Sequence, residues 1–306
     1  MPRFEKTTGI FRFRRWWKPQ ERSGPWQPPR IPELFDDFDT AVNQDHLGEG
    51  CRRLGVEPVG ELHFGYSRRS VGSVALARDG SQSWVKLSAL RGRATHWLCD
   101  GELSVEERKG VPRPTLLNSR LWSDGDMHFA ATQWTLAASP AVEPTSWAGA
   151  NASEVSDAWI ASLKDALSSL AKIETKRSRY QPQRVEWMIR NCFGSRAPCI
   201  ADEWCVAHGD LQWSNLTAPS LTLLDWECWG HAPRGYDAAY LIATSCANPE
   251  LVRRLERAFV HDLETPSGRV ARLTALANLI GLIKAGWLDP RYRRPLKAMA
   301  RTVLSA

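Results

Sequence analysis

The spacing of apolar residues changes once along this chain, and the change limits the folds that it can adopt. From Val59 to Trp134, apolar and β-branched residues stand in short runs between turn residues, which is typical of an antiparallel sheet. Beyond Pro144 they recur at intervals of three and four, the period of an amphipathic helix. A group of strands followed by a group of helices predicts an α+β protein with two lobes.

The sheet-forming part has five predicted strands. Turn residues, Asp79-Gly80 and Asp124-Gly125, separate the second strand from the third and the fourth from the fifth. The expected ranges are 59–66, 73–77, 83–87, 115–122 and 127–134 for the strands, and 91–103 for a helix. The pattern therefore predicts a small sheet with one helix inserted after its third strand.

The second part is predicted to be mostly helical. Leu163, Leu167 and Leu170 share one face of a helix, and Asn151 and Ser153 precede it as candidate N-caps. Further helices are expected at 181–193, 235–246, 249–262, 268–286 and 293–305. Two short apolar runs, 204–207 and 221–224, each end just before a polar cluster, so we expect short strands that lead into polar loops.

Charge is distributed unevenly along the 306 residues. The formal net charge is +6, and residues 1–30 hold eight basic and two acidic side chains, so the rest of the chain is neutral. The basic excess belongs to a tail and predicts no nucleic-acid partner for the body. Aromatic residues and prolines accompany it over 1–32, which is interpreted as a disordered leader or as an arm that docks on a partner or a membrane surface. We expect the N-lobe over 33–135 and the helical C-lobe over 136–306.

Cysteine usage and hydropathy predict where the protein works. The seven cysteines include no Cys-x-x-Cys pair, which favours reduced thiols in the cytoplasm. The most apolar helical segment, 273–288, is interrupted by Asn278 and Lys284 and is too short to span a bilayer. We therefore expect a cytoplasmic protein without stable membrane insertion.

Polar residues that follow the two short apolar runs of the second part can carry phosphoryl-transfer chemistry. His208-Gly209-Asp210 places a carboxylate five residues before the carboxamide of Asn215, and Asp225 follows the second apolar run. A carboxamide and a carboxylate can hold Mg²⁺ through their oxygens, while an Asp that is kept off the metal can orient an attacking hydroxyl. Either Asp could instead be an ordinary turn residue or cap.

This motif, His208-Gly-Asp-Leu-x-x-x-Asn215 followed by Leu-Leu-Asp225-Trp-Glu, resembles the aminoglycoside phosphotransferase and choline kinase family. The resemblance implies a bilobal protein-kinase-like fold, with a small antiparallel-sheet N-lobe and a larger helical C-lobe. It assigns Asp210 as catalytic base and Asn215 and Asp225 as metal ligands. It also implies ATP and Mg²⁺ as cofactors, with GTP left open. Asp237 resembles the residue that braces the catalytic core of the family, so we assign it to structure.

The resemblance also implies nucleotide-binding residues in the sheet lobe. Lys86 is similar to the third-strand lysine that contacts the α and β phosphates, and Glu102 is its expected partner, with Glu106 as the alternative. Trp134 lies in a segment that resembles the inter-lobe hinge, where the backbone holds adenine.

A candidate phosphate loop covers residues 65–74. It contains Ser67, Ser70 and Gly72, and it keeps only the final Gly-x-Val of the protein-kinase glycine pattern. An ordinary hairpin turn is the alternative interpretation.

The expected reaction is ATP-dependent transfer of phosphate to an alcohol hydroxyl of a small molecule, such as an antibiotic or a metabolite. Transfer to a Ser or Thr hydroxyl of a peptide and a pseudokinase without transfer activity are the alternatives. A neutral body argues against a polycationic aminoglycoside as acceptor. Trp213, Trp226 and Trp229 flank the motifs and form either an aromatic wall for the acceptor or part of the core.

Overall fold

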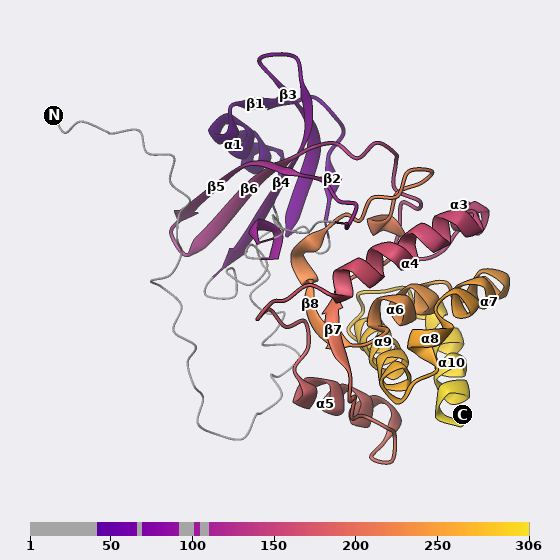
Figure 1. The fold of residues 1–306 in the computed structure, drawn as a ribbon. Helices are drawn as coiled ribbons and strands as arrows, with labels where there is room; N and C mark the ends of the chain where they lie inside the picture. Colours follow the sequence, from indigo (N-terminus) through magenta and orange to yellow (C-terminus); the bar gives the residue numbers. More distant parts are fainter. Residues whose placement is uncertain (1–41, 66–68, 92–100, 105–109, 306) are drawn as a thin grey trace.

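A computed structural model describes residues 42–65, 69–91, 101–104 and 110–305. A sheet with short helical segments forms the first part of this chain, and helices dominate the second (Figure 1). The tail expected over 1–32, together with Ser67 and Glu106, lies outside the described residues. The α+β, two-lobed arrangement predicted from the change of period is confirmed.

The N-lobe sheet is antiparallel throughout and has the strand order β1-β3-β4-β6-β5, with β2 also paired to β3. Helix α1 precedes the sheet. The bounds are α1 Gln44–Leu54, β1 Val56–Pro58, β2 His63–Phe64, β3 Ser70–Ala77, β4 Gln82–Arg91, β5 Leu116–Asp124 and β6 Met127–Trp134. The described sheet therefore has six strands where five were predicted.

Alternation along the strands divides the sheet into two faces. Val85 and Leu87 of β4 are buried with Leu47 and Cys51 of α1 in one apolar core. Because successive side chains of a strand point to opposite faces, Lys86 points away from α1. Its strand neighbours on that face are Gly72 of β3 and Thr132 of β6, both small. The sheet therefore presents Lys86 on its second face without a large neighbour directly beside it on either strand.

The N-lobe differs from the expectation in two places. The segment 59–66 is not one strand, because Val59 and Gly60 both donate their backbone N–H to Val74 O and so leave the regular ladder. Helix α1 was not predicted, although Asn43 caps its first turn and Gly55 ends it in the left-handed conformation with φ 78°. Of the helix expected over 91–103, the structure describes the helical residues 101–103, while Arg91 is the last residue of β4.

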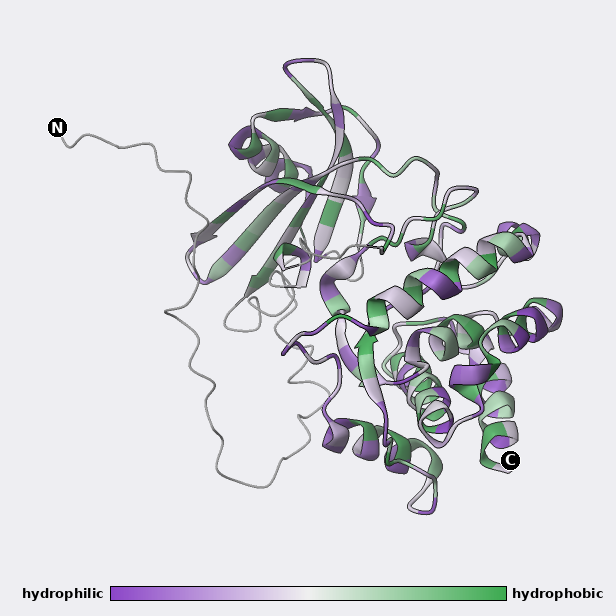
Figure 2. Ribbon diagram, viewed as in Figure 1, coloured by the Kyte–Doolittle hydropathy of each residue, from purple (hydrophilic) through white to green (hydrophobic). Residues whose placement is uncertain are grey.

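The C-lobe surrounds one long helix. The bounds of its elements are α3 Ala150–Glu154, α4 Asp157–Ala171, α5 Pro182–Phe193, β7 Trp204–Ala207, β8 Gly230–Pro233, α6 Tyr236–Thr244, α7 Pro249–Ala258, α8 Val260–Leu263, α9 Pro266–Lys284 and α10 Arg293–Ser305. Helix α9 packs against α5, α6, α8 and α10, so most of its residues are buried. Figure 2 shows hydrophilic stretches along α7, which lies outside, and hydrophobic ones along β7.

The C-lobe helices follow their predicted ranges closely, and the differences concern short elements. Ser156, rather than Asn151 or Ser153, caps α4. The run 221–224 forms one isolated bridge, between Leu216 and Leu223, instead of a strand. The partner of β7 is β8, which was not predicted. Among the helices that the structure describes, none combines the length and the apolar character needed to cross a bilayer.

Candidate active site

Lys86 connects the two lobes through carboxylates. Its Nζ donates to Glu102 Oε1 at 2.5 Å and to Asp225 Oδ1 at 2.7 Å, and it lies 3.5 Å from Glu227 Oε2. Glu102 belongs to the N-lobe, whereas Asp225 and Glu227 follow the second motif of the C-lobe. Burial alone would lower the pKa of Lys86, but these three carboxylates outweigh it and raise that pKa well above its usual value. Lys86 is therefore charged at neutral pH.

The same three carboxylates form a cluster that fits a divalent cation. Glu102, Asp225 and Glu227 each place one oxygen within 4.8 Å of the others, so Lys86 offsets only part of their negative charge. Burial raises the pKa of Glu102. Burial also acts to raise the pKa of Asp225, but Lys86 outweighs it, so the pKa of Asp225 falls below its usual value. Asp225 is thus ionised at neutral pH, as a carboxylate ligand of a hard cation has to be.

Asp225 has an unusual backbone conformation. Its φ of 60° and ψ of 71° are left-handed, and no other non-glycine residue in the described ranges has a positive φ. Asp tolerates this conformation better than most residues because its short polar side chain can bond locally. The 3₁₀ turn Trp226–Cys228 begins immediately afterwards. The turn places Glu227 beside Lys86 as well.

The catalytic loop is held by a helix start. Asp237, in the first turn of α6, accepts the backbone N–H of His208 at 2.6 Å and that of Gly209 at 2.9 Å. His208 Nε2 lies 2.8 Å from the carbonyl oxygen of Leu224, and burial lowers the pKa of His208 to about 4. The neutral ring therefore donates to Leu224 and joins the two motif loops. Both residues act on the backbone, which is the structural role expected for Asp237.

Asp210 and Asn215 lie against each other at the turn that follows. Asn215 Nδ2 donates to the carbonyl oxygen of Asp210 at 2.9 Å and lies 3.3 Å from its Oδ2. The amide oxygen of Asn215 takes no part in these two bonds and is the atom suited to a metal. Burial, assisted by the negative charge of Asp225, raises the pKa of Asp210 to about 7. Asp210 can therefore take up or release a proton near neutral pH.

The candidate phosphate loop is smaller than predicted. Gly72 is inside β3, paired with Lys86, so the connection between β2 and β3 ends before it. The hairpin is closed by a bond from Gly65 N to Ser70 O, and Ser70 is the first residue of β3. The reason for glycine at position 72 is packing, because a Cβ there would lie 2.3 Å from Cζ2 of Trp84.

Trp134 ends β6, the last strand before the C-lobe. Its ring is buried, and its Nε1 donates to Thr132 Oγ1 at 2.9 Å. Trp134 pairs with Trp84 of β4, so it lies on the same face of the sheet as Lys86. Trp134 is thus the last sheet residue before the chain continues into the helical part.

Two arginines that the sequence analysis missed support both motif loops. Arg177 donates to the carbonyl oxygens of Trp229 at 2.7 Å and Glu227 at 2.6 Å. Arg179 donates to the carbonyl oxygen of Gly209 at 3.1 Å. Both come from the connection between α4 and α5. Because they act on backbone carbonyls, no pattern of side chains in the motifs could have indicated them.

The three tryptophans near the motifs belong to the interior. Trp213, Trp226 and Trp229 are all buried, which supports core packing and argues against an open aromatic wall for the acceptor. Trp229 has a further contact, because its Nε1 donates to the carbonyl oxygen of Gly101 at 2.7 Å. Gly101 precedes Glu102, so this bond joins the two lobes next to the ion pair of Lys86.

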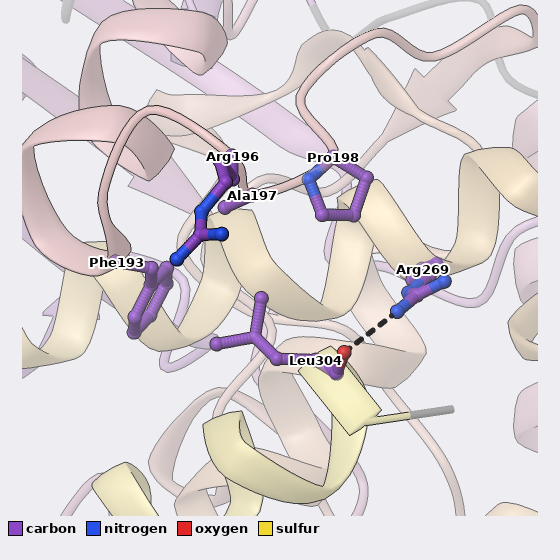
Figure 3. Close-up of a pocket in the computed structure, with 6 residues that line it drawn as sticks. All are labelled: Phe193, Arg196, Ala197, Pro198, Arg269 and Leu304. Carbon is purple, nitrogen blue, oxygen red and sulfur yellow. Dashed lines mark hydrogen bonds between the residues drawn. The ribbon is translucent and has the colours of Figure 1, made fainter.

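A hollow of about 550 Å³ lies elsewhere, between the α5–β7 connection and the ends of α9 and α10 (Figure 3). Its lining residues are Phe193, Arg196, Ala197, Pro198, Arg269 and Leu304. None of them belongs to the predicted site. Arg269 is already engaged, because it donates to the carbonyl oxygens of Val303 and Leu304 at 3.0 Å each.

Comparison with solved structures identifies the fold. An amicoumacin kinase in complex with AMP-PNP and Ca²⁺ superposes with a TM-score of 0.57 at 11% identity, over 87% of this chain and 94% of that one. A thermostable aminoglycoside phosphotransferase in a ternary complex with AMP-PNP and hygromycin B superposes with a TM-score of 0.56 at 11% identity, over 84% and 98%. This chain has the fold of the aminoglycoside phosphotransferases.

The resemblance inferred from the two motifs is thus confirmed at the level of the fold. A spectinomycin phosphotransferase bound to ADP and spectinomycin gives a TM-score of 0.50 at 10% identity, over 85% of this chain and 95% of the other. No protein-family model matches the sequence, and no curated protein matches it significantly. The kinase-like fold is therefore evident from the structure while the sequence has diverged.

Proposed function

We propose that this protein is a kinase that transfers the γ-phosphate of ATP to an alcohol hydroxyl of a small molecule. The observation that carries the proposal is the ion pair of Lys86 with Glu102 and Asp225, which brings both lobes together beside the loop of Asp210 and Asn215. Structures with this fold include kinases of amicoumacin, hygromycin B and spectinomycin, which favours a small molecule over a peptide as acceptor.

In this proposal Asp210 orients the acceptor hydroxyl and accepts its proton. A pKa of about 7 suits a general base near neutral pH, because the group is partly ionised and still basic enough to take the proton. Asn215 keeps the carboxyl group in place through its amide nitrogen. The bonds of Asp237 to the loop backbone fix the position from which Asp210 acts.

The nucleotide is proposed to bind between the lobes. Lys86, kept charged by its carboxylates, binds phosphate oxygens, and Ser70 and Gly72 of β3 lie on the same face of the sheet as Lys86. The backbone at Trp134 holds the base. Asn215 and Asp225 would hold a magnesium ion, which supplies positive charge to offset that of the phosphates when it is bound.

The cellular location follows from the same chemistry. The cytoplasm contains ATP, and free thiols stay reduced there. Six cysteines within the described ranges are unpaired, including the buried Cys51 and Cys199. We therefore propose a cytoplasmic kinase.

Thermal unfolding tests the nucleotide site. Mg²⁺-ATP at saturation is expected to raise the melting temperature of the wild type, because a ligand that binds only the folded state stabilises it. Asp225→Ala should abolish the magnesium-dependent shift, whereas Asp124→Ala, at the exposed end of β5, should leave it intact. Parallel scans with GTP decide the base preference. An unchanged shift in Asp225→Ala would contradict the metal assignment.

Phosphate transfer tests the reaction itself. We expect incorporation of labelled γ-phosphate into at least one member of a panel of hydroxyl-bearing antibiotics, metabolite alcohols and Ser/Thr peptides. Asp210→Asn should slow that transfer by roughly 10²- to 10⁴-fold, the range for loss of a general base, with nucleotide binding unchanged. Labelling of peptides alone would support the protein-kinase alternative. Nucleotide binding without transfer to any acceptor would support a pseudokinase.

A further inference from the structure

Five exposed basic side chains lie together on the outer side of the C-lobe. Lys284 is the last residue of α9, and the other four are on α10. None of them has an ion pair or hydrogen bond within the part of the chain that the structure describes. We call these residues the basic face: Lys284, Arg293, Arg294, Lys297 and Arg301.

Many exposed arginines of this protein are paired, which sets the basic face apart. Arg52 bonds Glu49 at 2.6 Å, and Arg253 bonds Glu250 at 2.5 Å. In residues 284–305, by contrast, six basic side chains stand against one acidic side chain, Asp289, and this acid is engaged by Arg291 at 3.0 Å. The mutual repulsion of the five remaining cations is therefore not relieved by any acid of this segment.

The five cations are arranged in a compact group. Arg293, Lys297 and Arg301 are four residues apart, so they form one row along α10 of about 12 Å. Burial raises the pKa of the Cys192 thiol at the end of α5, and Lys284, Lys297 and Arg293 each counteract this rise. Because only nearby charges lower a pKa in this way, Lys284 of α9 and Lys297 and Arg293 of α10 all lie close to Cys192.

We propose that the basic face binds the phosphate backbone of a nucleic acid. No large apolar residue of 284–305 is exposed, so the face lacks the apolar centre that a protein partner would need. A membrane-surface helix inserts its apolar face, but Leu296 and Val303 of α10 are buried in the lobe. A nucleic-acid backbone, by comparison, is bound mainly through its charge.

This proposal revises the expectation drawn from charge counting. The neutral balance of residues 31–306 is the sum of a basic segment, 284–305, and an excess of acidic side chains elsewhere, so the two cancel in the total. Helix α10 lies at the outer end of the helical lobe, away from the sheet (Figure 1). Binding there is therefore independent of the proposed kinase site.

The test measures binding of the full chain to a fluorescent 20-nucleotide oligouridylate between about 50 and 200 mM salt. In the face variant, all five residues of the basic face are changed to Gln. The control variant removes five charges from the tail instead, by changing Arg12, Arg14, Arg15, Lys18 and Arg22 to Gln. Net charge is thus the same in both variants. The melting temperature of the face variant should stay near that of the wild type, because exposed substitutions change stability little.

We expect the face variant to lose at least about tenfold in affinity, and its salt slope to fall by roughly 3.5, since each single-strand phosphate contact contributes about 0.7. The tail variant should keep most of the wild-type slope. An equal or larger loss in the tail variant, or no binding by the wild type at low salt, overturns the proposal. Tighter face-dependent binding to phosphatidylserine vesicles than to RNA also overturns it. Should the fivefold variant not fold, Lys297→Glu with Arg301→Glu makes the same test with two changes.

Discussion

Gly209 and Gly80 form a matched pair for testing how closely the two motif loops are packed. Their φ angles are 82° and 83°, so alanine has nearly the same backbone cost at both positions. A Cβ on Gly209 would lie 2.2 Å from the carbonyl oxygen of Cys228, whereas a Cβ on Gly80 would meet nothing within 4 Å. The difference between the two alanine variants therefore isolates the contact with the loop that follows Asp225.

The expected magnitudes follow from these geometries. A left-handed alanine costs about 1–2 kcal/mol, so Gly80→Ala should lower the free energy of unfolding by about that amount. Gly209→Ala adds an overlap with rigid backbone, for which about 1–3 kcal/mol is typical, so its total is roughly 2–5 kcal/mol. At about 2–4 °C for each kcal/mol, Gly80→Ala should melt about 2–8 °C lower and Gly209→Ala roughly 4–20 °C lower.

Urea and thermal unfolding of both variants measure the difference, and the transfer assay adds a functional comparison. Because Gly209 immediately precedes Asp210, its displacement should also reduce phosphate transfer, whereas Gly80→Ala in an exposed turn should retain it. Equal destabilisation of the two variants would refute the inference that the loop of Asp210 is packed directly on the loop after Asp225.

Three further predictions concern residues around the site and one helix. Burial lowers the pKa of His208 from 6.5 to about 4, so the stability that a neutral ring provides is complete above pH 6.5 and is lost as the pH falls towards 4, by up to about 3 kcal/mol. His208→Gln cannot titrate, and urea unfolding should show a flatter dependence on pH in this range; an unchanged profile would contradict the burial of a neutral ring. Trp229→Phe removes the bond to Gly101 and should cost about 1 kcal/mol, while also weakening the thermal shift with Mg²⁺-ATP; a wild-type shift would mean that this bond does not support the nucleotide site. Gly281→Ala, in α9 with nothing within 4 Å of the new Cβ, should raise the melting temperature by about 2–4 °C because alanine favours a helix by about 1 kcal/mol, and a decrease would speak against an undistorted helix there.

Local patterns predicted much of this site because its residues follow strand ends at short spacing. Asp210 and Asn215 are five residues apart and remain neighbours in the structure, and the pairing of Lys86 with Glu102 spans only 16 residues. The supporting arginines are different. Arg177 reaches carbonyl oxygens 50 and 52 residues away, and a backbone acceptor has no sequence signature.

The error at Gly72 also comes from a contact with another part of the chain. The glycine pattern suggested a loop at Gly72, but the ring of Trp84 determines that position from the neighbouring strand. Helix α1 is short, yet its buried residues Leu47, Cys51 and Leu54 follow a helical period and its two caps are visible in the sequence. Those two caps and the helical period together predict the helix.

The ion pairs of Lys86 have a consequence for nucleotide affinity. The ammonium group of Lys86 bonds Glu102 and Asp225, and Glu227 lies close by. A phosphate oxygen that reaches Lys86 therefore competes with carboxylates of the same protein, and each contact it gains is offset by one that it weakens. If the proposed nucleotide binds, its affinity is a difference between two sets of ion pairs, those of Lys86 with phosphate and those of Lys86 with its carboxylates. Removing Glu227, which is not one of the proposed metal ligands, can therefore tighten nucleotide binding, whereas removing Asp225 also removes a metal ligand.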